Sequence, residues 1–255
     1  MSWLSLLDPS LLIIFTLVLS RMAGLLVTAP IYGGTDIPPQ ARILLAVALA
    51  MLITPSQLAR AVAPPQTLVD LLIVMVGEAM IGLILGLGIL ILLSGLQLAG
   101  QIISQLGGNS IGEVFNPQLD ANVPLFAQVF NYFALAIFAI VGGHRIMMAA
   151  LLDTFVAMPP GAATFDDSLV EICSTLVTQS LVLGIQISAP ATAVLLLTNI
   201  VLGIISRTLP QLNVLSFGFG FNALITFGML WLSLGGLGDI FLTHWQQTLD
   251  TLLGQ

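Results

Sequence analysis

A row of three glutamines and one serine is the polar pattern on this chain with the clearest chemical potential. Gln97, Gln101 and Gln105 are spaced four residues apart and Ser104 follows Gln101 by three, so all four fall on one face of a helix. An amide that faces lipid is costly, so this row should face another helix or water. Two interpretations remain open: hydrogen bonding between helices, or the polar lining of a wet lumen.

Acidic side chains in apolar surroundings point to a second kind of chemistry. Glu78 is the most isolated acid and follows Asp70 by eight residues on the same expected helix. Intramembrane acids often mark ion pathways, so Glu78 is a candidate proton relay; it can equally lie at the headgroup level or pair with an arginine. The alternative function is therefore a proton-coupled small-solute transporter that uses Asp70, Glu78 or Glu113.

Other reactive groups are scarce. The chain has one cysteine, Cys173, and two histidines, His144 and His244, too few and too dispersed for a disulfide framework or a metal centre. It carries no phosphate-binding loop and no serine-nucleophile motif, so we expect no catalytic residues, no metal and no cofactor. Its five basic residues face twelve acidic ones, for a net charge of −7, which argues against nucleic acid as a partner.

The elements that must position these residues are long apolar helices. Charged residues make up 7% of the chain, against about 25% in an ordinary soluble domain. Three stretches carry no charge at all: 34 residues after Glu78, 35 after Glu171 and 31 after Arg207. Each exceeds the roughly 20 apolar residues that cross a bilayer, so the chain is expected to be an integral membrane protein.

Six apolar segments predict an all-α, polytopic membrane protein of about six long, kinked helices, folded as a single domain over residues 1–255. The third segment begins at the capping sequence Thr67-x-x-Asp70 and can continue as one helix to about Leu106, because no proline intervenes. Pro190 predicts a kink or a two-part helix in the fifth segment. Gly82-x-x-x-Gly86 in the third is a close-packing motif. The expected segments are about 11–31, 41–53, 67–106, 124–142, 168–207 and 211–238.

The connection over about 104–123 is the most informative loop. Its glycines and Pro117 prevent a helix, yet it carries more apolar bulk than a solvent loop usually does. Irregular backbone at membrane depth is tolerated only where it is buried in protein or lines a wet cavity. We therefore predict a re-entrant pore loop, with an extramembrane turn packed on a partner as the other interpretation. The residues expected to form it are Gly107, Gly108, Ile111, Gly112, Glu113, Phe115, Asn116, Pro117, Leu119 and Asp120.

Four stretches spread over nearly the full length resemble one family. They begin at Arg21-Met22-Ala23-Gly24, at Asn116-Pro117-Gln118, at Gly142-Gly143-His144-Arg145 and, most specifically, at Arg207-Thr208-Leu209-Pro210-Gln211-Leu212-Asn213-Val214. On these motifs the chain resembles the FliR family of flagellar export-gate membrane proteins, whose counterparts serve virulence type III secretion. The Pro-Pro-Gly after Met158 and the Ser-Phe-Gly after Leu215 favour the flagellar branch.

The resemblance implies a non-enzymatic gate subunit in the bacterial inner membrane, at the flagellar basal body. It implies a hetero-oligomer with FliP and FliQ family subunits, an FlhB-type protein at the gate entrance, and unfolded proteins as export substrates. In such proteins the loop between the third and fourth segments lies in the pore and helps to plug it, which offers the glutamine row a wet lumen. We further expect the turn with Arg207, Pro210, Gln211 and Asn213 to organise subunit contacts.

Overall fold

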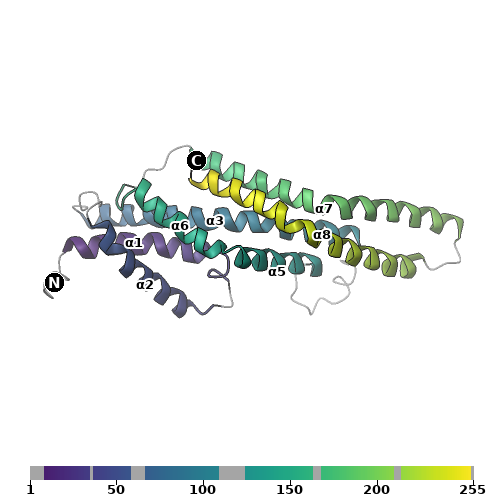
Figure 1. Cartoon of the computed structure of the whole chain (residues 1–255), viewed down its shortest axis with the longest axis horizontal. Helices are drawn as coiled ribbons and strands as arrows, with labels where there is room; N and C mark the ends of the chain where they lie inside the picture. Colours follow the sequence, from purple (N-terminus) through teal and green to yellow (C-terminus); the bar gives the residue numbers. More distant parts are fainter. Residues whose placement is uncertain are drawn as a thin grey trace. The chain divides into compact units, whose positions relative to one another are not determined.

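A computed structural model describes residues 9–34, 37–58, 67–108, 124–162, 168–209 and 214–253 (Figure 1). All regular structure in these ranges is α-helical, which confirms the predicted all-α class. The helices are α1 (Pro9–Thr28), α2 (Pro39–Gln57), α3 (Leu68–Leu106), α5 (Leu125–Ile140), α6 (Gly143–Ala157), α7 (Ser168–Thr208) and α8 (Val214–Leu253).

Four of these helices, α1, α2, α3 and α7, are long and apolar enough to cross a membrane, and α5 with α6 makes a fifth span if the two count as one. This agrees with a polytopic membrane protein. Many large apolar side chains are exposed in the isolated chain, among them Leu52 on α2 and Trp231 on α8, each 76% exposed. Such a surface suits lipid or neighbouring subunits rather than water.

The sequence signals for α3 are confirmed. The helix runs without interruption to Leu106, and at its start the backbone N–H of Asp70 donates to Thr67 Oγ1 at 3.1 Å, as the capping sequence predicts. In α7 the structure has one continuous helix through Pro190, so the prediction of a two-part helix is wrong and the kink stays a prediction. The stretch after Gly142 is a separate helix, because Gly142 takes a left-handed conformation with φ 76° between α5 and α6.

The chain forms two compact units, and α3, α5, α7 and α8 each contribute residues to both. The first unit comprises Met1–Leu90, Ala139–Thr175 and Leu249–Gln255. In it, α1 lies along the first half of α3 with glycines at the contact. A Cβ on Gly82 would overlap the carbonyl oxygen of Arg21, and one on Gly24 would overlap that of Ala79. The predicted close-packing role of Gly82 is therefore confirmed.

The second unit comprises Ile91–Phe138 and Leu176–Thr248. Its α7 and α8 run side by side in opposite directions, as hydrogen bonds at both ends record: Thr248 donates to Gln179, and Asn222 to Asn199. Gly100 lets α3 approach the backbone of α5 at Ala127. Edge-to-face aromatic pairs join α5 to α8, with ring centroids 5.4 Å apart in both Phe126–Phe227 and Phe138–Trp245. The prediction of a single domain over residues 1–255 stays a prediction.

Candidate functional site

The glutamine row of α3 borders a groove lined by both polar and apolar side chains. Ser94, Gln97 and Gln101 of α3 line it together with Ser180 of α7, and its volume is about 360 Å³. The hydroxyls of Ser94 and Ser180 lie 3.3 Å apart across it. Both glutamines are half-buried, so their amides face a hollow of the unit rather than its core.

The last two members of the row lie apart from this groove. Ser104 is fully buried, and its hydroxyl has no hydrogen-bond partner among the residues described, whereas Gln105 is exposed. The structure thus brings Gln97 and Gln101 together at one hollow and gives Ser104 and Gln105 different surroundings. An amide pair in a groove can accept and donate hydrogen bonds to a neighbouring chain or to water.

The end of α3 is held by two asparagines that sequence analysis did not single out. Asn199 Nδ2 on α7 donates to the carbonyl oxygen of Leu106, the last residue of α3, at 3.0 Å. Asn222 Nδ2 on α8 donates in turn to Asn199 Oδ1 at 2.8 Å. Immediately beyond, Gly108 has φ 71° and ends the helix in a left-handed conformation. The available signal was weak, because each amide lies in a charge-free, largely apolar run that also holds other amides, such as Gln186 and Asn213.

Most of the predicted pore loop lies outside the described residues. Gly107 and Gly108 are described, Gly107 buried and Gly108 half-buried. Ile111, Gly112, Glu113, Phe115, Asn116, Pro117, Leu119 and Asp120 fall outside the described ranges. The same holds for Pro210, Gln211 and Asn213 of the predicted contact turn, while Arg207 lies exposed in the last turn of α7.

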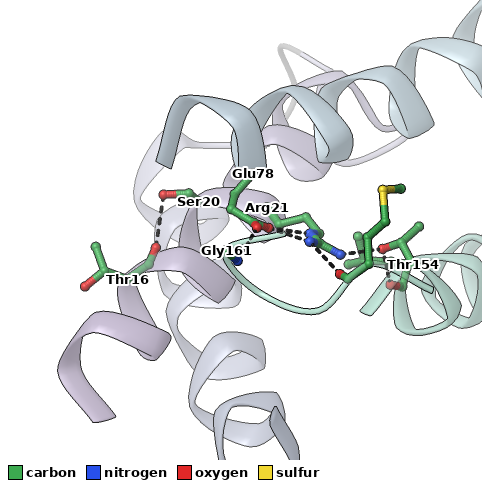
Figure 2. A network of polar contacts seen from close by, with 8 residues as sticks. Thr16, Ser20, Arg21, Glu78, Thr154 and Gly161 are labelled. Carbon is green, nitrogen blue, oxygen red and sulfur yellow. Dashed lines mark hydrogen bonds and ion pairs between the residues drawn. The ribbon is translucent and has the colours of Figure 1, made fainter. Parts of the chain in front are cut away.

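A buried ion pair joins α1 to α3. Nε and Nη2 of Arg21 each lie 2.6 Å from Glu78 Oε2, and both side chains are 0% exposed. Arg21 extends further to α6: its Nη1 donates to Thr154 Oγ1 at 3.1 Å and its Nη2 to the carbonyl oxygen of Met158 at 3.0 Å. Figure 2 shows Arg21 and Glu78 directed toward one another, with Thr154 beyond the guanidinium. Three interpretations of Glu78 were open: a proton relay, a place at the headgroup level, or pairing with an arginine. The structure shows the pairing with an arginine.

The second oxygen of Glu78 is used as well. Its Oε1 accepts a hydrogen bond from the backbone N–H of Gly161 at 2.9 Å. The Arg21 guanidinium also lies over the Phe155 ring, 4.2 Å from its centroid, a favourable place for a cation. These contacts of the pair thus come from α1, α3, α6 and the turn after α6. A carboxylate so fully occupied is suited to holding these elements together.

Nothing in the described part of the chain groups three or more His, Cys, Asp or Glu side chains closely enough to hold a metal ion. Cys173 is exposed and His144 is half-buried on α6. The polar features assembled among the described residues include a groove, a helix-end anchor and an ion pair.

Comparison with known proteins identifies the family. The family described as bacterial export proteins, family 1, matches residues 12–248 of the chain. The chain belongs to that family. The resemblance to FliR proteins is confirmed by relatives among the bacterial export proteins that carry that name.

Two FliR proteins and one secretion-system protein illustrate the likeness. The flagellar biosynthetic protein FliR of Bacillus subtilis (strain 168) is 28% identical over 243 residues, covering 93% of this chain and 92% of the relative. The FliR protein of Escherichia coli (strain K12) is 28% identical over 201 residues, covering 79% of this chain and 76% of the relative. The secretion system apparatus protein SsaT of Salmonella typhimurium is 28% identical over 150 residues, covering 58% of each chain. This member of the bacterial export proteins is thus similar to both flagellar and secretion-system proteins.

Proposed function

We propose that this chain is a non-enzymatic subunit of a bacterial type III protein export gate, and that its loop over about 104–123 closes the channel at rest. The observation that carries the proposal is the family match across residues 12–248, with flagellar FliR proteins among the relatives. Its place is the bacterial inner membrane at the flagellar basal body. Its partners are FliP and FliQ family subunits, an FlhB-type protein and unfolded export substrates.

The described residues support a subunit that works inside an assembly. Long helices leave large apolar side chains uncovered, including Leu52, Leu224 and Trp231, and a lone chain gains little by such exposure. Gln97 and Gln101 line a groove that can meet a wet lumen or a neighbouring helix. Both features suit a chain whose surfaces are completed by other subunits and by lipid.

The loop's role rests on where it begins and what it contains. It leaves α3 at a point fixed by a left-handed glycine, Gly108, and by the asparagine contact to Leu106. Its apolar residues Ile111, Phe115 and Leu119 offer bulk to fill a lumen, and its glycines allow close approach of backbone. A plug of this composition closes the channel by filling it, without any bond being made or broken.

The transporter alternative gains no support from the described acids. Glu78 is bonded through both oxygens, to Arg21 and to Gly161, and Asp70 accepts a hydrogen bond from Thr67 at 2.6 Å. Both acids are thus engaged in local contacts, and Glu113 lies outside the described residues. We therefore keep the export gate as the proposed function.

The test is deletion of residues 110–118 in a cell that makes the complete gate. The gate should assemble with its partners at the wild-type level, and ion leakage through it or premature export should rise. The amount of assembled complex, measured by co-purification, is the control for expression. Unchanged conductance at equal assembly would overturn the plug, and failure to co-purify with any export-gate subunit would overturn the whole proposal.

A further inference from the structure

The carbonyl of Leu106 is the last feature of α3 before the chain enters the proposed plug loop. The final carbonyls of an α-helix have no partner within the helix, and they are satisfied by caps, water or neighbouring groups. Here the partner of Leu106 is the side-chain amide of Asn199 on α7, at 3.0 Å. A residue far away in sequence therefore completes the end of α3.

The direction of this hydrogen-bond chain is fixed by chemistry. A carbonyl oxygen has no hydrogen to give, so Asn199 must present its NH₂ group to Leu106. That orientation turns Asn199 Oδ1 outward as an acceptor, and Asn222 Nδ2 on α8 donates to it at 2.8 Å. Turning either amide over would place two acceptors against each other. The relay Asn222 to Asn199 to Leu106 therefore has a single workable arrangement, and in it Asn222 Oδ1 is buried without a hydrogen-bond partner among the described residues.

Both asparagines occupy positions where an amide is expensive. Each lies in a charge-free apolar run, and Asn222 is only 7% exposed. An amide without partners in such surroundings destabilises the fold. An amide at this place can do what an apolar residue cannot, because only a polar group can form a hydrogen bond to the carbonyl at the helix end.

We propose that Asn199 and Asn222 are positioning residues of the gate: they pin the last turn of α3 to α7 and α8, so that the plug loop starts from a fixed point. This inference rests on the proposed function, because the loop must be a plug for its starting point to matter. The Asn199 amide acts directly on Leu106, and Asn222 acts through Asn199. Losing Asn199 should therefore have the larger effect.

The test compares Asn199→Leu, Asn222→Leu and the double variant in the assembled gate, with conductance normalised to the amount of complex. Asn199→Leu should raise resting leakage roughly two- to tenfold, the range expected when the closed state loses one hydrogen bond. Asn222→Leu should raise it less, and the double variant no more than Asn199→Leu alone. Asn131→Leu on α5 of the same unit is the control, because its half-buried amide lies outside the relay.

A second measurement separates local from general damage. The backbone N–H groups of Gly107 and Gly108 donate to Ile103 and Gln105 in the last turn. In Asn199→Asp, which keeps the shape of the side chain but replaces the donor with a carboxylate oxygen that repels the Leu106 carbonyl, hydrogen exchange over 104–108 should speed up while that over 92–98 stays unchanged. This variant also serves if Asn199→Leu fails to assemble.

The outcomes distinguish this inference from the proposed function. Leakage after deletion of 110–118, but none in the asparagine variants, overturns the relay and leaves the gate standing. If neither the deletion nor the asparagine variants raise leakage, both the relay and the proposed plug are overturned. Equal leakage in Asn131→Leu and Asn199→Leu, or uniform acceleration of exchange along α3, also overturns the relay, because the effect would then be general.

Discussion

Removing one partner of the Arg21–Glu78 pair should destabilise the chain more than removing both. Both side chains are fully buried, and their atoms lie 2.6 Å apart. Arg21→Met leaves the Glu78 carboxylate with only the N–H of Gly161 as a partner. Leaving such a charge uncompensated costs about 3–5 kcal/mol, a large part of the roughly 5–15 kcal/mol that stabilises a typical protein.

The double variant Arg21→Met/Glu78→Leu should lose less. It removes both charges and leaves three neutral groups without a present partner: the N–H of Gly161, the carbonyl of Met158 and Thr154 Oγ1, whose hydroxyl still donates to Leu151. Gly161 and Met158 are half-buried, so water can reach part of this turn. We expect a loss of about 2 kcal/mol, since an orphaned polar group costs about 1–3 kcal/mol when fully buried.

The assay is denaturant or thermal unfolding of the chain in detergent, as a double-mutant cycle with Glu78→Leu as the second single variant. Each single variant should lower the melting temperature by on the order of 10 °C, and the double variant by less than either. Additive losses would refute the reasoning, because they would mean that the two charges do not stabilise each other. Wild-type stability in both single variants would refute it as well.

Two further predictions concern packing and the groove. Gly82→Ala should cost about 1–3 kcal/mol, because the added Cβ meets the Arg21 carbonyl. Gly203→Ala, where a Cβ meets nothing within 4 Å, should instead stabilise α7 by up to about 1 kcal/mol; equal melting temperatures for the two variants would contradict this. Gln101→Leu should lower co-purification with partner subunits but not the stability of the isolated chain, whereas Gln105→Leu, outside the groove, should assemble like wild type.

Local signals explain why much of the fold could be predicted. Continuous apolar runs and the Thr67 cap specify α3 without help from the rest of the chain. Spacing alone places Gly82 and Gly86 on one face, where α1 then packs closely. Pro190 does not divide α7 in two, because a proline removes one backbone bond and an apolar helix this long retains the others.

The contacts between distant segments could not be predicted in the same way. Several arginines were available to Glu78, and nothing in the spacing selects Arg21, 57 positions earlier. Asn199 and Asn222 looked like isolated polar residues because their meaning depends on which helix ends beside them. Sequence therefore indicates that a polar group needs a partner, and only the tertiary arrangement says which one.

The place of Arg21 within α1 has a consequence for how the protein is made. Arg21 emerges from the ribosome in the first apolar helix, whereas Glu78 belongs to the third. Until Glu78 arrives, α1 enters the lipid with an uncompensated guanidinium, at a cost of about 2.5–3.5 kcal/mol near the helix centre. The insertion of α1 is therefore less favourable during translation than its apolar residues alone would make it, and pairing with Glu78 offsets that cost once α3 has followed it into the bilayer.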